Sequence, residues 1–144
     1  MEEVPDDLRR YPTKDGREAL AARLGLTIDP YSQDWEWEVA EPENFETWLA
    51  LYRDAPLSDD ERFSLMEMLI QCVEDMVSAQ GPPEEVEQLP QWQAVATLLQ
   101  ANPQLHASSI AYWSAFDHDN PEEAFRVSFP MRRVWTAVKP TLGT

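Results

Sequence analysis

The longest apolar pattern in the chain runs from Leu57 to Gln80 and predicts a long helix. Ser58 and Glu61 at its start have the spacing of a capping box, in which each side chain caps the other residue's backbone N–H. The polar residues of this stretch recur every three or four positions and form one narrow stripe: Ser64, Glu67, Gln71, Glu74 with Asp75, and Ser78. A helix with so narrow a polar face is normally buried on most sides.

We therefore expect a central buried helix over about 58–80, ended by Gly81-Pro82-Pro83. Four apolar residues lie opposite the polar stripe, and we expect them to be almost fully buried: Met66, Leu69, Ile70 and Val73.

Shorter helical patterns precede this central helix. Residues 1–13 read as an irregular lead-in, and Lys14–Leu24 reads as a helix that stops at Gly25. Glu41-Pro42 begins a further helix, which ends at Ala55-Pro56. Its apolar residues have the spacing of one helical face: Phe45, Trp48, Leu49 and Tyr52.

The stretch 29–39 has two interpretations. Asp29-Pro30 is a helix-start signal, and Tyr31, Trp35 and Val39 then follow at four-residue spacing. The alternation in Trp35–Val39 is instead typical of a strand. We favour the helix, because the start signal is good and no partner strand for a hairpin follows.

After the central helix the pattern predicts a loop at 81–85 and further helices with short connections. The expected helices are Pro90–Ala101, a helix after Asn102-Pro103 that reaches Phe116, a short turn after Asn120-Pro121 and Pro130–Val138, with Arg126–Phe129 as a strand candidate. The expected fold is a compact all-α bundle of six to eight helices in a single domain over 1–144, with at most one short strand pair.

The net charge of −16 is unevenly distributed. Residues 1–87 hold 23 Asp and Glu against 7 Lys and Arg, whereas residues 88–144 hold 4 of each kind. Such a field repels nucleic-acid phosphate and anionic lipid and attracts basic proteins. The alternative is that the acidity serves solubility only. We expect the few arginines near the C-terminus to pair with acids of the same chain and not with nucleic acid.

Candidate catalytic groups are few. Asp117-His118-Asp119 reads as a polar turn, and Cys72 lies in an apolar helical run where a thiol behaves as a small apolar group. The chain contains no GxxxxGK[ST], GxGxxG or GxSxG motif and only four glycines. We therefore expect a protein that is not an enzyme and that has no catalytic, metal-binding or cofactor-binding residues and no cofactor.

We expect neither a secretory signal nor a membrane-spanning segment in this sequence. The N-terminus is acidic and lacks the basic-then-apolar order of a secretory signal. No apolar run approaches the roughly 18 residues of a membrane span. A single cysteine is compatible with a reducing compartment, so we expect a cytoplasmic protein.

What remains is a protein-interaction function. An acidic segment with two close tryptophans and without Lys or Arg suits a basic protein partner, because charge speeds encounter and an aromatic supplies anchoring energy. The predicted contact residues are Asp34, Trp35, Glu36, Trp37, Glu38, Glu41, Glu43 and Glu46.

This profile resembles that of small acidic inhibitors of basic toxins, including the immunity proteins of bacterial competition systems; the resemblance is one of profile and not of motifs. The alternative is a non-catalytic adaptor or subunit of a larger cytoplasmic assembly. The pattern predicts neither the partner's identity nor an oligomeric state.

Overall fold

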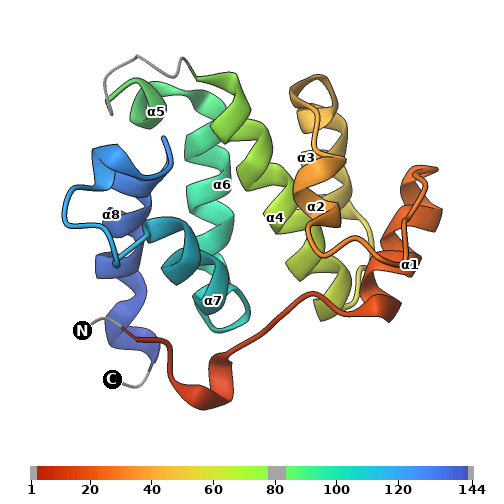
Figure 1. Ribbon diagram of the computed structural model, residues 1–144, viewed down its shortest axis with the longest axis horizontal. Helices are drawn as coiled ribbons and strands as arrows, with labels where there is room; N and C mark the ends of the chain where they lie inside the picture. The colour runs from red at the N-terminus through yellow and green to blue at the C-terminus, as the bar shows by residue number, and fades with distance from the viewer. Residues whose placement is uncertain (1–2, 78–83, 143–144) are drawn as a thin grey trace. The chain divides into compact units, whose positions relative to one another are not determined.

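The computed structural model describes residues 3–77 and 84–142, and in these residues the chain is all-α, with eight α-helices and no strand (Figure 1). The predicted fold class is confirmed. The chain divides into two compact units, which are described separately below. Tyr11–Asp75 is the N-terminal unit, and Met1–Arg10 together with Met76–Thr144 is the C-terminal unit. The single domain stays a prediction.

The N-terminal unit contains the first four α-helices. They are α1 (Lys14–Leu24), α2 (Trp35–Glu38), α3 (Phe45–Asp54, preceded by a 3-10 helix at Pro42–Asn44) and α4 (Asp59–Met76, whose last residue belongs to the C-terminal unit). α1 has the predicted bounds, because Thr13 caps the Gly16 N–H at 3.0 Å and Gly25 adopts the left-handed conformation with φ 66°. The predicted apolar stripe of α3 is buried: Phe45, Trp48, Leu49 and Tyr52.

The capping box at the start of α4 is confirmed. Ser58 Oγ accepts a hydrogen bond from the Glu61 N–H at 3.1 Å, and Glu61 Oε1 accepts one from the Ser58 N–H at 3.1 Å. The four residues expected to be buried are each 0% exposed: Met66, Leu69, Ile70 and Val73. α4 ends at Met76, and residues 78–83, including the predicted Gly-Pro-Pro stop, lie outside the described residues.

The polar stripe of α4 is not the exposed face that the sequence predicts. Ser64 is 0% exposed and Glu67 is 6% exposed. Ser64 Oγ donates to Glu36 of α2, Glu61 accepts from Arg23 of α1, and Arg62 donates to the Tyr52 carbonyl of α3. α4 is therefore hydrogen-bonded to α1, α2 and α3 and is central to the N-terminal unit. Within the polar stripe, the acceptor that Glu36 supplies makes the burial of Ser64 possible.

The stretch 29–39 is neither one helix nor a strand. Asp29 Oδ1 accepts from the Tyr31 N–H at 2.9 Å, so Asp29 stabilises a turn and does not start a helix. Tyr31 is 90% exposed, and α2 begins only at Trp35. The expected stripe of Tyr31, Trp35 and Val39 is wrong for this reason, and only the helical conformation of Trp35–Glu38 is retained from the prediction.

The C-terminal unit contains the other four α-helices. They are α5 (Glu84–Gln88), α6 (Pro90–Ala101), α7 (Pro103–Ser114) and α8 (Ser128–Val138), with 3-10 helices at Asp6–Leu8, Pro121–Glu123 and Lys139–Leu142. α6 has the predicted bounds. α5 occupies the end of the predicted loop, and the strand candidate Arg126–Phe129 is wrong because α8 begins at Ser128. Ser128 Oγ accepts from the Phe125 N–H at 3.1 Å and donates to the Trp113 carbonyl of α7 at 2.7 Å, so it connects the start of α8 to α7.

Arg132 of α8 caps the C-terminal end of α7. Its Nε donates to the Ser114 carbonyl at 2.8 Å, and its Nη2 donates to the carbonyls of Ala115 and His118 at 2.7 Å each. Ala115 has φ 52°, in the left-handed region, which ends α7 at Ser114 and before Phe116. The cation therefore satisfies carbonyls that the helix end leaves open.

Replacing Glu61 with Gln should lower the free energy of unfolding of the N-terminal unit by about 1–2 kcal/mol at pH 7, because the charged hydrogen bond from Arg23, 2.6 Å long and partly exposed, is lost. Burial raises the pKa of Glu61, but hydrogen bonds from Ser58 and Arg23 together hold the pKa below its ordinary value of 4.5.

A lowered pKa of Glu61 means that its charge stabilises the folded protein above pH 4.5 and that this contribution is lost as pH falls through the folded value. The difference between wild type and variant, measured by urea unfolding, should therefore shrink below pH 4.5. Asp59→Asn at an exposed position of the same turn is the control, expected to change stability by less than about 0.5 kcal/mol. A difference that is constant with pH would contradict this prediction.

Candidate functional site

The eight predicted contact residues divide into an exposed and a buried set. Trp35 is 2% exposed and Glu36 is 3% exposed, whereas Trp37 is partly exposed. The remaining carboxylates are exposed: Asp34, Glu38, Glu41, Glu43 and Glu46. The structure therefore places only part of the predicted surface in reach of a partner.

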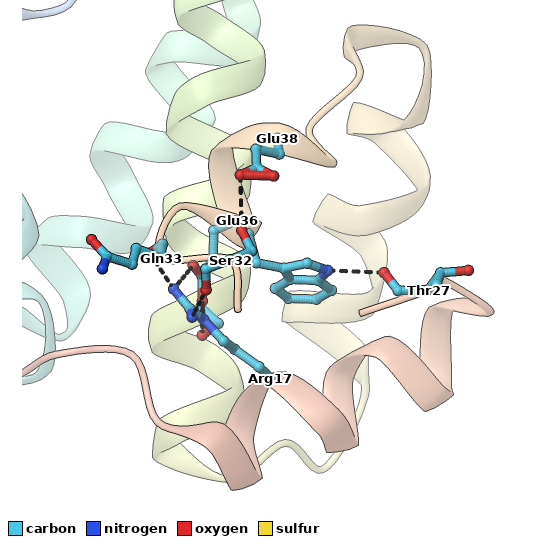
Figure 2. Close-up of polar contacts among 8 residues, drawn as sticks. Arg17, Thr27, Ser32, Gln33, Glu36 and Glu38 are labelled. Atoms are coloured by element: carbon cyan, nitrogen blue, oxygen red, sulfur yellow. Dashed lines mark hydrogen bonds and ion pairs between the residues drawn. The ribbon is translucent and has the colours of Figure 1, made fainter. Parts of the chain in front are cut away.

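Glu36 belongs to a buried polar network (Figure 2). Arg17 Nε donates to Glu36 Oε2 at 2.8 Å and Arg17 Nη2 donates to Oε1 at 2.7 Å, so the ion pair is bidentate. Ser64 Oγ donates to Oε2 at 2.7 Å. Arg17 also donates to the carbonyls of Ser32 and Gln33, at 3.1 Å and 2.8 Å. One guanidinium thus joins α1, the turn before α2, and α2 itself.

Trp35 is held inside the same unit. Its indole Nε1 donates to the Thr27 carbonyl at 3.1 Å (Figure 2), which satisfies the buried polar end of the ring. The expectation that Trp35 and Glu36 are surface groups is therefore corrected. Trp35 lies in the core with its indole bonded to Thr27, eight positions away, and Glu36 pairs with Arg17, 19 positions away.

The exposed carboxylates form a continuous acidic segment along the chain, and we use the name acidic segment for residues 29–46. It contains no Lys or Arg. The pKa of Glu41 is raised from its ordinary value because the Glu43 side chain shares a hydrogen bond with it and repels its charge. Two like charges are thus held close together at the surface, and a cation from a partner would weaken the repulsion between them.

Tyr31 is the exposed aromatic residue that the sequence prediction missed as a candidate anchor. It is 90% exposed and follows Asp29, whose carboxylate accepts from its backbone N–H. The signal was present in Asp29-Pro30, since an Asp before Pro also favours a turn, and a turn would have placed Tyr31 at the surface. The acidic segment therefore presents Tyr31 fully and Trp37 in part.

His118 and Cys72 are the other two residues that the sequence offers as candidate chemical groups. His118 lies in an exposed turn, with its Nδ1 3.4 Å from Asp117 Oδ1. Burial raises the pKa of the Cys72 thiol to about 12, and its Sγ donates to the Glu41 carbonyl at 3.4 Å. Within the described part of the chain, no group of three or more His, Cys, Asp or Glu is arranged to hold a metal ion.

The arginines of α8 were expected to pair with acids of the chain. Arg133 does so, with both oxygens of Glu87 at 2.9 Å from its Nη1. Arg132 instead binds the backbone carbonyls described above.

None of the helices in residues 3–77 and 84–142 combines the length and apolar character that crossing a membrane requires. Comparison of the chain with protein-family models, curated proteins and solved structures finds no match.

Proposed function

We propose that the protein is a small acidic binding module that neutralises a basic protein partner, as an inhibitor or immunity-type protein does. The observation that carries the proposal is the exposed acidic segment, in which six exposed carboxylates lie without an intervening cation: Asp29, Asp34, Glu38, Glu41, Glu43 and Glu46. The N-terminal unit as a whole holds 16 Asp and Glu against 5 Lys and Arg, a net charge of −11. The C-terminal unit holds 11 against 6, a net of −5.

The carboxylates of the acidic segment and its exposed Tyr31 contribute to binding in different ways. The carboxylates attract a basic partner over a distance that salt limits to about 8–10 Å, and so increase the association rate. Tyr31 offers a large, rigid ring that a partner surface can cover, which slows dissociation. A Lys or Arg of the partner placed between Glu41 and Glu43 would also remove the repulsion that raises the Glu41 pKa.

An affinity pull-down with the intact chain, followed by identification of what is retained, is the first experiment. One tight, basic protein whose activity is abolished in the complex supports the proposal. Retention of a multi-subunit assembly with no inhibited activity would favour the adaptor.

Charge reversal of Glu38 and Glu43 to Lys should slow association with that partner by about tenfold at low salt and flatten its salt dependence. Both residues are exposed, so folding should change by less than about 0.5 kcal/mol. The measurement is stopped-flow or surface-based binding kinetics at two or more ionic strengths.

The matched control reverses Asp119 and Glu123, exposed acids of the C-terminal unit, to Lys and changes the net charge equally. It should slow association less than twofold, because these two acids are not part of the acidic segment that the proposal assigns to the contact. Equal slowing by the two double variants would show that the overall charge acts and not this segment. Tyr31→Ala should separately speed dissociation by about tenfold.

A further inference from the structure

The turn that carries Tyr31 buries almost none of its own side chains. Residues 29–34 lie between the end of α1 and the start of α2, where the structure has no regular element. Ser32 is partly exposed, and the other five side chains of this turn are exposed: Asp29, Pro30, Tyr31, Gln33 and Asp34. Apolar burial therefore contributes little to the conformation of the turn, which depends on hydrogen bonds instead.

Arg17 of α1 supplies the hydrogen bonds that connect this turn to α1. Its Nη1 donates to the Ser32 carbonyl at 3.1 Å, and its Nη2 donates to the Gln33 carbonyl at 2.8 Å (Figure 2). Other bonds of the turn are local, since Asp29 accepts from the N–H groups of Tyr31 and Ser32 at 2.9 Å and 3.0 Å. The local bonds close the turn, and Arg17 fixes its place on the N-terminal unit.

The guanidinium of Arg17 is itself fixed by buried partners. Its side chain is 16% exposed and pairs with both carboxylate oxygens of Glu36, and Ser64 donates to one of these oxygens. Glu36 belongs to α2, so one group holds the turn and the helix that follows it. A guanidinium can do this because its donors lie in a rigid, planar fork.

We propose that Arg17 is a positioning residue that keeps the turn 29–34 in one conformation, so that Tyr31 and the carboxylates beside it are arranged before a basic partner arrives. Arg17 is largely buried and lies outside the acidic segment, so it acts through the turn. A contact surface that is already ordered loses less conformational freedom on binding and therefore binds more tightly. This inference rests on the proposed function, because it concerns how the acidic segment is prepared for that partner.

The test separates positioning from stability. Arg17→Ala would leave Glu36 buried without a cation, so the variant is Arg17→Met combined with Glu36→Leu. Such paired replacement of buried charges by apolar residues is often neutral for stability. The net charge is unchanged, whereas Met donates nothing to the carbonyls of Ser32 and Gln33.

The matched control is Arg23→Met combined with Glu61→Gln. It removes an Arg–Glu pair between α1 and α4 and also leaves the net charge unchanged. Gln can still cap the start of α4. In the described part of the chain, neither Arg23 nor Glu61 is hydrogen-bonded to the turn 29–34.

The first measurement is NMR relaxation of the backbone amides in the free chain, because it needs no partner. The order parameters of residues 31–34 should fall from about 0.85 to below about 0.6 in the Arg17 double variant and stay unchanged in the control. Circular dichroism checks that both variants are folded. Unchanged order parameters in the folded double variant would overturn the inference. If that variant does not fold, Arg17→Lys takes its place, because an ammonium keeps a cation beside Glu36 without the fork.

The second measurement uses the basic protein that the intact chain retains in the pull-down. The Arg17 double variant should raise its Kd about tenfold, the result expected if the ordered turn is populated only about a tenth of the time. The salt dependence of association should stay the same, because the net charge is unchanged. The Arg23 control should change the Kd by less than about twofold.

The outcomes separate this inference from the proposed function. An unchanged Kd in the Arg17 double variant, with association still slowed by charge reversal of Glu38 and Glu43, overturns the positioning role and leaves the proposed function in place. If no basic protein is retained, or if charge reversal has no effect on association, the proposed function fails and the binding role of Arg17 is overturned with it.

Discussion

Replacing Glu36 with Ala should lower the free energy of unfolding of the N-terminal unit by about 3–5 kcal/mol. The side chain is 3% exposed and accepts three hydrogen bonds, two from Arg17 and one from Ser64. Its removal leaves the Arg17 guanidinium, whose side chain is only 16% exposed, without its carboxylate, and leaves the fully buried Ser64 hydroxyl without this acceptor. Most of the expected loss of stability is the cost of keeping Arg17 and Ser64 buried without the carboxylate that they bind.

Glu38→Ala is the matched control for Glu36→Ala. Glu38 lies two residues further along α2, is exposed and accepts one hydrogen bond, from Ser32 Oγ at 2.8 Å. Its replacement should change stability by less than about 0.5 kcal/mol. Urea unfolding followed by circular dichroism measures both variants, and equal stabilities for the two would contradict the placement of Glu36.

A double variant tests how much the buried ion pair of Arg17 and Glu36 contributes to stability. The combined change Arg17→Met with Glu36→Leu removes both charges together, and such replacements are often neutral or stabilising by about 1–4 kcal/mol. Recovery of stability in this double variant is the expected result, and it would show that the cost of Glu36→Ala comes from an unpaired cation. Failure to recover would assign net stabilisation to the pair itself.

Replacing Ile70 with Ala should cost about 2–5 kcal/mol, because the side chain is 0% exposed and its truncation leaves a cavity in addition to the lost burial. Ile70 lies on α4, the helix to which α1, α2 and α3 are bonded. Close packing around it limits how far the neighbours can relax into the vacated space.

Ile70→Val is the control at the same position and should cost only about 0.5–1.5 kcal/mol, because it removes a single methylene. Chemical unfolding of both variants gives the two values. A loss below about 0.5 kcal/mol for Ile70→Ala would show that α4 is not the centre of the N-terminal unit.

Several predictions that rest on neighbouring residues are confirmed, although the helix start expected at Asp29-Pro30 and the strand candidate Arg126–Phe129 are wrong. The capping box of Ser58 and Glu61, the bounds of α1 and α6 and the apolar stripe of α3 depend on contacts within three or four positions of the chain. Those contacts are present in any helix with this sequence, so periodicity and cap residues are sufficient to predict them.

The candidate site was predicted only in part, since the sequence identifies an acidic segment but does not say which of its side chains are exposed. Glu36 and Glu38 have the same residue type and lie two positions apart, yet one is buried and the other is exposed. The difference comes from Arg17, 19 positions away from Glu36 in sequence, and Ser64, 28 positions away. A local pattern contains no information about such partners.

The sequence by itself determined the all-α class, the start of α4 and the acidity of the segment 29–46, because helix periodicity, caps and charge are properties of short stretches. The tertiary structure alone decided that Trp35 and Glu36 lie inside. It also decided that the polar stripe of α4 meets Glu36 and that Arg132 closes the end of α7. These outcomes depend on which distant segments supply a hydrogen-bond partner, and burial of a polar group is favourable only where such a partner is present.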